Sequence, residues 1–191
     1  NSLNTAVGYY AGQSVTTGIQ NTLIGGLAGD ALTDADFNTA VGQDALHSDT
    51  LGSRSVAIGR RSLYTQNFTS ATDTYNTGVG FNAGYSITTG TQNTLIGGQA
   101  GDAITTGGNN TAVGKDALSA TTTGADNVAI GKDALLLNTT AANNTAIGRH
   151  SLGANTTGAE NVAVGNYTLD ANTTANNNTA VGYFSLSANT T

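Results

Sequence analysis

The chain has 191 residues and a formal net charge of −6, and it contains 26 Gly but no Pro, Cys, Met or Trp. With only 9% charged and 6% aromatic residues, it resembles neither a disordered segment, which is rich in charge and Pro, nor an ordinary globule with one large core. The acidic balance disfavours nucleic acid, no apolar run approaches the roughly 20 residues that would insert in a membrane, and the lack of Cys excludes disulfides and thiolate metal sites.

A five-residue motif of the form N-T-A-V-G recurs along the whole chain. Its copies occupy residues 4–8, 21–25, 38–42, 55–59, 76–80, 93–97, 110–114, 127–131, 144–148, 161–165 and 178–182. The closing glycines recur at a constant interval of 17, except for one interval of 21 between Gly59 and Gly80. The sequence therefore predicts a single repeat domain over residues 1–191, with a four-residue insertion within about 64–75.

Each motif has the alternation of a short β-strand. Val or Ile stands directly before the closing Gly, and Thr or Val usually stands two places earlier. The repeat unit is too short for a pair of helices, and Gly is too frequent. We predict an all-β fold, a parallel β-solenoid of about eleven 17-residue coils spaced about 4.8 Å apart. We expect the Val/Ile column to line the inside of each coil, and the Gly to provide positive φ or a close backbone approach.

The first position of the motif predicts a second column. Asn occupies it in ten copies and Ser55 in the remaining one. In a stack, buried Asn side chains can bond to one another and to backbone groups at the turn. We assign this structural ladder to Asn21, Asn38, Asn93, Asn110, Asn127, Asn144, Asn161 and Asn178.

The two positions after each closing Gly vary among Arg, Lys, Asp, Tyr and Phe, which predicts a solvent-facing corner. The insertion, with its own aromatic residues, is expected to bulge from one coil as an exposed loop. The candidate surface contacts are Tyr9, Tyr10, Phe68, Tyr75, Phe81, Tyr167, Tyr183 and Phe184. They could bind a host-surface glycan or a receptor, and a merely solvated edge is the alternative.

No residue pattern points to catalysis, a cofactor or a metal. The two histidines, His47 and His150, are six units apart. Asp30, Asp34 and Asp36 could offer oxygen ligands to Ca²⁺, but most units lack them. We therefore expect no enzymatic activity and no bound cofactor or metal.

Several motifs resemble known fibre repeats. Residues 55–59 (S-V-A-I-G) and 127–131 (N-V-A-I-G) are similar to the head repeat of trimeric autotransporter adhesins, although the 17-residue unit is longer than the coils of those heads. Residues 110–118 are similar to the N-T-A-V-G-x-x-A-L repeat of phage tail fibres. The resemblance implies left-handed parallel β-rolls that pack as a homotrimer along a threefold axis.

We accordingly expect a structural or adhesive fibre protein, a rigid homotrimeric rod at an extracellular, cell-surface or virion location. A second copy placed after Thr191 would continue the regular interval from Gly182 to its own Gly8, so we expect end-to-end stacking into a filament or tail fibre. An ice-binding protein is one alternative, because Thr stands three places before the Gly in eight units. A tailspike-like enzyme that degrades polysaccharide is another, since Asp116 and Asp133 would stack as a carboxylate pair beside two lysines.

Overall fold

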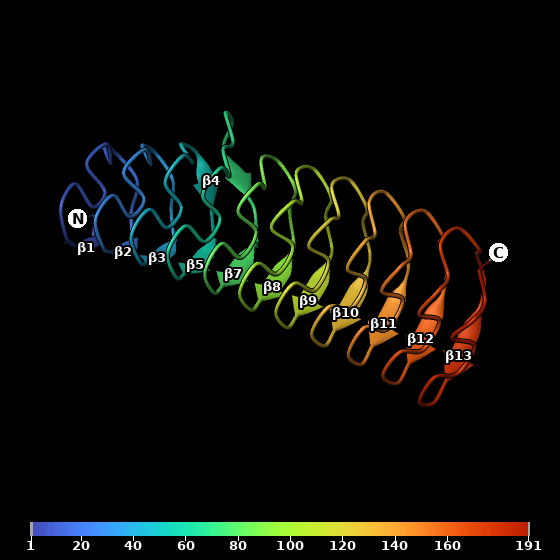
Figure 1. The fold of residues 1–191 in the computed structure, drawn as a ribbon. Coiled ribbons are helices and arrows are strands. Elements are labelled where there is room, and N and C mark those ends of the chain that lie inside the picture. Colours follow the sequence, from blue (N-terminus) through green and yellow to red (C-terminus); the bar gives the residue numbers. More distant parts are fainter. Residues whose placement is uncertain (1, 191) are drawn as a thin grey trace.

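Every copy of the motif forms a three-residue strand in the computed structural model, which describes residues 2–190. Eleven strands pair in parallel as one sheet, in the order β1 (Thr5–Val7), β2 (Thr22–Ile24), β3 (Thr39–Val41), β5 (Val56–Ile58), β7 (Thr77–Val79), β8 (Thr94–Ile96), β9 (Thr111–Val113), β10 (Val128–Ile130), β11 (Thr145–Ile147), β12 (Val162–Val164) and β13 (Thr179–Val181). The chain thus winds about ten times between the first and the last strand (Figure 1). This confirms the all-β class and the parallel β-solenoid with its 17-residue coil.

The insertion leaves the stack intact. β5 and β7 pair directly, with Val56 opposite Thr77, although these two residues are separated by 21 positions instead of 17. The extra residues form a loop that projects from the stack and carries β6 (Thr72–Asp73), which pairs in parallel with β4 (Gly52–Ser53) (Figure 1). The four additional residues are therefore absorbed outside the coil.

The inside of each coil is lined by the middle residue of the strand, not by Val or Ile. Ala129 is fully buried, whereas its neighbour Ile130 is 38% exposed. Neighbouring side chains of a strand point to opposite faces, so the Thr/Val and Val/Ile positions share one face, and that face is outward. Our expectation that the Val/Ile column lies inside is wrong. The interior is narrow. In most coils a buried Leu or Ile from the following turn fills it and leaves room for a small middle residue, whereas Leu23 and Leu95 take the middle position in coils whose following turn has Gly29 or Gly101.

Two further positions, both after the strand, contribute to this interior, and a Gly at the first is matched by a larger aliphatic residue at the second. The position four places after the closing Gly holds either Gly or Leu, and the position seven places after it changes in step. In four coils Gly is followed by an aliphatic residue, in the pairs Gly12/Val15, Gly29/Leu32, Gly84/Ile87 and Gly101/Ile104. In the other seven coils Leu is followed by a polar residue, in the pairs Leu46/Asp49, Leu63/Gln66, Leu118/Thr121, Leu135/Asn138, Leu152/Asn155, Leu169/Asn172 and Leu186/Asn189. We call these Gly–aliphatic and Leu–polar coils.

The closing Gly of each motif is needed for two reasons. Gly42 has φ +139, a conformation that side chains disfavour. A Cβ on Gly42 would also lie 2.6 Å from the carbonyl oxygen of Gly59 in the next coil. Both roles expected for this glycine are present. Three other positions in each coil also have left-handed φ. They lie two and four places after the closing Gly and directly before the first residue of the next motif, as at Asp44, Leu46 and Arg54.

The Asn column forms a continuous hydrogen-bonded ladder over most of the stack. Asn127 is typical: its backbone N–H and its side-chain Nδ2 donate to Oδ1 of Asn110, at 3.1 and 3.2 Å, and Nδ2 also donates to the carbonyl of Ala141 at 2.9 Å. All members assigned from the sequence make the equivalent bond to the preceding rung or accept one from the next, and Asn4 and Asn76 belong to the same column. In the C-terminal half, the polar residues Asn138, Asn155 and Asn172 form a second ladder beside it.

Ser55 interrupts the first ladder, and residues next to the insertion bridge the gap. Gln66 is fully buried; its Nε2 donates to Ser55 Oγ at 2.8 Å, and its Oε1 accepts from Asn76 Nδ2 at 2.9 Å. Thr74 Oγ1 lies 2.6 Å from Ser55 Oγ. The hydrogen-bonded path therefore continues from Asn38 to Asn76 through Gln66, in the coil that carries the insertion.

Candidate functional site

The outward side of the eleven-stranded sheet runs from the first coil to the last. We call the Thr/Val and Val/Ile positions of its strands the outward face. Every residue of this face is Thr, Val or Ile, and none is charged. In the middle of the stack Ile58, Ile96 and Ile130 remain 38–39% exposed. A contiguous uncharged face of this kind is typical of an interaction surface.

The corner after each closing Gly is exposed at its first position and half-buried in most coils at its second. Tyr9, Phe81 and Tyr183 project from the first position, and Arg60 approaches the Phe81 ring at 5.8 Å. At the second position Tyr167 stacks on Phe184 with their ring centroids 5.0 Å apart. The remaining candidates at this corner, Tyr10 next to Tyr9 and Phe184 next to Tyr183, are exposed at the two ends of the stack. The aromatic candidates of this corner therefore form two groups, one at each end of the stack, and Phe81 lies apart from both.

Phe68 is only 6% exposed, so its assignment as a surface contact is wrong. Its backbone N–H donates to Oδ1 of the fully buried Asp49 at 3.0 Å, and the same oxygen accepts from the Gly52 N–H at 3.1 Å. Gln66 Nε2 donates to the other Asp49 oxygen at 2.6 Å. The chain leaves the stack only after Phe68, and burying this ring in the coil wall is favourable. The segment from Gln66 to Phe68 thus anchors the insertion.

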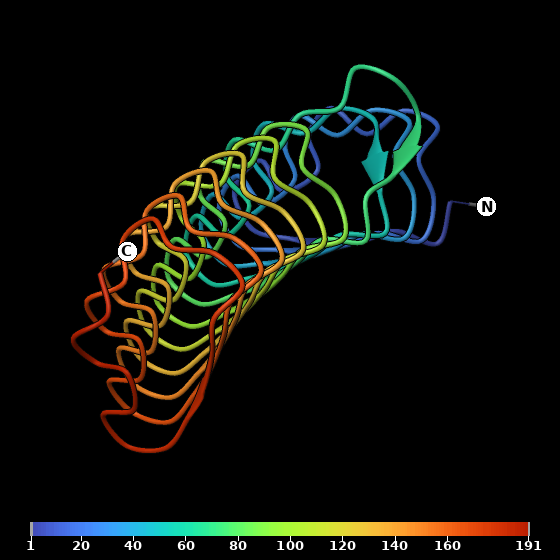
Figure 2. The same cartoon turned by 90° about the vertical axis from the view of Figure 1, so that its right-hand side faces the viewer.

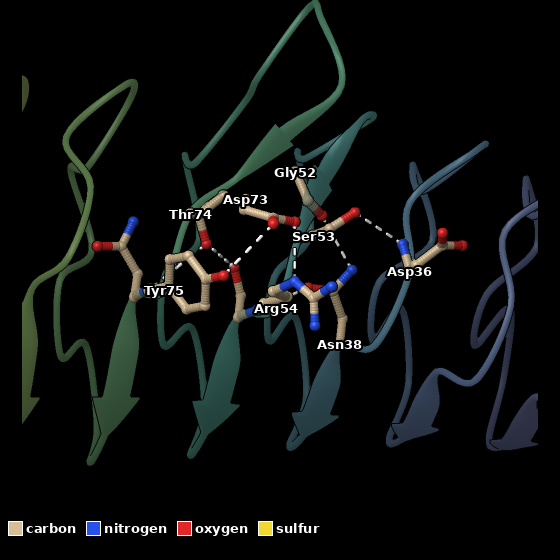
Figure 3. Close-up of polar contacts among 10 residues, drawn as sticks. Asp36, Asn38, Gly52, Ser53, Arg54, Asp73, Thr74 and Tyr75 are labelled. Carbon is tan, nitrogen blue, oxygen red and sulfur yellow. Dashed lines mark hydrogen bonds and ion pairs between the residues drawn. The ribbon is translucent and has the colours of Figure 1, made fainter.

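Tyr75, by contrast, lies on the surface with residues that the sequence did not single out. Arg54 Nε contacts Asp73 Oδ1 at 3.0 Å, and Tyr75 Oη donates to Asp73 Oδ2 at 3.4 Å (Figure 3). On the other side, the Arg54 guanidinium lies over the Phe37 ring at 4.7 Å from its centroid. We call Phe37, Arg54, Asp73 and Tyr75 the insertion patch. Arg54, Asp73 and Tyr75 lie at the foot of the β4–β6 ribbon (Figure 3). Phe37, Arg54 and Tyr75 stand directly before the ladder residue, whereas the other aromatic candidates, apart from the buried Phe68, follow the closing Gly.

Two residues of the insertion patch that were not predicted, Phe37 and Arg54, could have been recognised from the repeat. Phe37, Arg54 and Tyr75 occupy the same position in three successive coils, directly before the ladder residue. In the six coils that follow, this position holds Gln92, Asn109, Asp126, Asn143, Glu160 and Asn177. A comparison of this one column would have separated Phe37 and Arg54 from the rest. Asp73 depends on the path of the insertion, which the repeat does not specify.

The titratable residues form local pairs. His47 Nε2 lies 3.7 Å from Asp30, and His150 Nδ1 lies 2.6 Å from Asp170. Asp133 is paired with Lys132 at 3.4 Å, and Asp116 with Lys115. The two histidines contact different aspartates, and each carboxylate of the Asp116–Asp133 pair contacts a lysine.

The three aspartates considered for Ca²⁺ also have separate partners. Asp34 accepts from the hydroxyl of Thr17 at 2.5 Å, and Asp36 accepts from the backbone N–H of Ile19 at 2.8 Å. Within residues 2–190, no group of three or more His, Cys, Asp or Glu side chains is arranged to hold a metal ion.

Burial raises the pKa of two aspartates, Asp30 and Asp102, that occupy equivalent positions in different coils. For Asp30 the burial effect is opposed by the nearby His47. For Asp102 it is opposed by hydrogen bonds from its own backbone N–H and from Gln99. In both aspartates the Oδ1 atom is buried without a hydrogen-bond partner, and in Asp30 this atom lies 3.7 Å from Nε2 of His47.

The described part of the chain encloses no pocket. It also contains no helix long and apolar enough to cross a membrane. No protein-family model, curated protein or solved structure matches the chain. Functional inference therefore depends on the two surfaces described above, the outward face and the insertion patch.

Proposed function

We propose that the protein is a structural or adhesive fibre: a rigid homotrimeric rod of left-handed β-solenoid coils in an extracellular filament, on a cell surface or in a viral tail fibre, without catalytic activity. The observation that carries this proposal is the outward face. It presents β-branched residues without a charge on all eleven rungs and leaves them partly exposed in the single chain.

Association through this face has a clear physical reason. Burial of apolar surface contributes about 25 cal/mol per Å². The interior of one coil holds an Ala or Leu from the strand and one or two further aliphatic residues, so a single solenoid has a thin core. Three chains that meet through their outward faces would bury Val and Ile at each level, and the gain would accumulate along the rod. The resemblance to trimeric fibre repeats supports the same stoichiometry.

The shape of the stack supports a wound assembly. The coils are not stacked straight; each is turned relative to the one before it, from one end of the stack to the other (Figure 2). Three twisted faces can wind about a common axis, because each rung then meets the equivalent rung of its partners. The proposal includes end-to-end stacking, in which the Asn ladder of one chain would continue in the next.

The test is the oligomeric state of the wild type and of two neighbouring variants. Sedimentation equilibrium should give a trimer for the wild type, and Ile130→Asp should give folded monomers, because the charge would be buried between chains. Ala129→Asp should instead unfold the surrounding coils, since Ala129 is inside. Thr140→Asp, on an exposed turn, should remain trimeric. A wild type that stays monomeric at high concentration would refute the proposed rod.

One observation favours ice binding as a second candidate. The eight Thr of the outward face stand in the same column, and the Val/Ile column beside them is also exposed, so two regular columns face solvent together. The twist of the sheet argues against a match to a flat crystal plane (Figure 2). Thermal hysteresis that is present in the wild type and lost in Thr111→Asp, with a monomeric protein, would select this function over the rod.

A further inference from the structure

The insertion patch combines aromatic rings with a charged pair in one exposed place. Phe37 and Tyr75 are 40% and 52% exposed, and the side chains of Arg54 and Asp73 are 42% and 50% exposed. Phe37, Arg54 and Tyr75 follow one another on three adjacent rungs, about 4.8 Å apart. The coil that supplies Asp73 and Tyr75 is the one with the insertion. The patch is thus the place where the repeat departs most from its own pattern.

The fold alone does not account for these residues. The position directly before the ladder residue is left-handed in every coil, and most coils other than those of Phe37, Arg54 and Tyr75 fill it with Gln, Asn, Asp or Glu. An exposed ion pair such as Arg54–Asp73 adds little to stability. A local departure from the repeat pattern that brings no gain in stability is more typical of a functional site than of a structural one.

The chemistry of the patch is that of a hydroxyl-rich ligand. The guanidinium of Arg54 has five N–H donors, and one of them contacts Asp73. Each oxygen of Asp73 has one contact within the patch and keeps acceptor capacity. Donors and acceptors therefore lie side by side, flanked by aromatic rings that can cover apolar C–H groups. A sugar ring offers both: hydroxyls that donate and accept, and C–H faces that pack on aromatic rings.

The charge of the patch further restricts the class of ligand that it can bind. Arg54 and Asp73 neutralise each other, and the chain as a whole carries −6. A sulfated or sialylated glycan would place its anion beside the Asp73 carboxylate and would be repelled. We propose that the insertion patch binds neutral oligosaccharides, with Tyr75 and Phe37 against the C–H faces of successive sugars and with Arg54 and Asp73 bonded to their hydroxyls. This deepens the adhesive part of the proposed function, on which it rests, by assigning it a ligand class and residues.

The first experiment uses an array of neutral oligosaccharides of hexoses and N-acetylhexosamines, with sialylated and sulfated counterparts printed beside them. The wild type should bind neutral members and not their anionic counterparts. Calorimetric titration with the best neutral member should then show an affinity loss of at least about tenfold for Tyr75→Ala and for Arg54→Ala, as expected at the centre of a binding site. A wild type that binds no neutral glycan, or prefers the anionic ones, overturns the proposal.

The matched control is Phe81→Ala, which removes an exposed aromatic residue next to an arginine, Arg60, on a different corner. It should bind as the wild type does, and all variants should keep the wild-type circular dichroism spectrum and melting temperature. Equal losses for Phe81→Ala and Tyr75→Ala would contradict a site at the insertion patch. Ile130→Asp separates the two proposals: as a folded monomer it should retain glycan affinity per chain, and Tyr75→Ala should remain trimeric.

Discussion

At the scale of single residues, the molecule replaces a large apolar core with hydrogen bonds between identical side chains. Each ladder amide is removed from water but keeps partners in the preceding and the following coil, as at Asn127. A buried polar group with its partners costs little, whereas one that loses them costs about 1–3 kcal/mol. The ladder is therefore stable only as long as it is nearly complete, and the bridge through Gln66 at the Ser55 break fits this requirement.

Replacement of Asn144 by Ala should lower the free energy of unfolding by about 3 kcal/mol. Asn144 Oδ1 accepts from the backbone N–H and from Nδ2 of Asn161, at 3.0 and 3.2 Å, and its Nδ2 donates to the Gly158 carbonyl at 2.9 Å. The variant leaves these buried groups without partners. Chemical denaturation measures the loss, with the exposed Thr140→Ala as control. If the two variants unfold at the same denaturant concentration, the ladder is not a source of stability.

Asp102 gives a prediction about pH. Burial raises its pKa above the usual 3.8, so the folded protein binds the proton more tightly than the unfolded chain does. Its contribution to stability is therefore full below pH about 3.8 and is lost as pH rises through the folded pKa. Asp102→Asn should raise the melting temperature at pH 7, and the gain should disappear in acid. Asp126→Asn, at an exposed turn, is the control and should leave the melting temperature at pH 7 as it is in the wild type.

At the scale of the coil, the two coil types explain which residues can be exchanged. Gly101 is left-handed, with φ +57, but Leu118 adopts φ 55 at the equivalent position, so conformation alone does not require Gly. Space does: a Cβ on Gly101 would lie 2.8 Å from the side chains of Leu95 and Ile104. The two coil types therefore fill the interior with apolar side chains placed at different positions.

Gly101→Leu should accordingly destabilise the protein by about 1–3 kcal/mol or more, the usual effect of overpacking. Adding Leu95→Ala in the same coil should recover much of the loss, because the interior volume is redistributed as it is in the Leu–polar coils. A double-mutant cycle on the unfolding free energies measures the coupling. Additive effects of the two substitutions would mean that the strain at residue 101 comes from the backbone.

The repeat predicted the solenoid, the register and the ladder, because a fixed spacing of 17 leaves few other ways to stack identical residues. It did not predict which face of the strand is buried. Alternation shows that the Thr/Val and Val/Ile positions share a face, but hydrophobicity alone assigned that face inward. The volume of Leu46 and its equivalents decides the matter, since they already fill the interior. Phe68 was misplaced for a related reason: the insertion has no second copy within the chain that would show its path.

At the scale of the whole molecule, different sides of the stack have different properties. One side is the uncharged outward face, which we propose lines a threefold axis, and Arg54, Asp73 and Tyr75 of the insertion patch lie away from it, at the foot of the β4–β6 ribbon (Figure 3). In the proposed rod, assembly and ligand binding would use separate surfaces. Three patches would then be displayed at the same height, and simultaneous contact with one branched or clustered glycan would raise the overall binding strength.

The pairing of each coil with only its two neighbours has a consequence for how the number of coils can change in evolution. The main sheet pairs each strand only with those of the adjacent coils, so a whole coil can be gained or lost without changing any contact farther along. The Gly–aliphatic coils recur as neighbouring pairs, Gly12 with Gly29 and Gly84 with Gly101, and the second pair follows the first by four coils plus the insertion. This is the pattern that duplication of a four-coil block leaves. Recombination between such copies can therefore lengthen or shorten the rod in whole coils, while the winding of every coil that remains is unchanged.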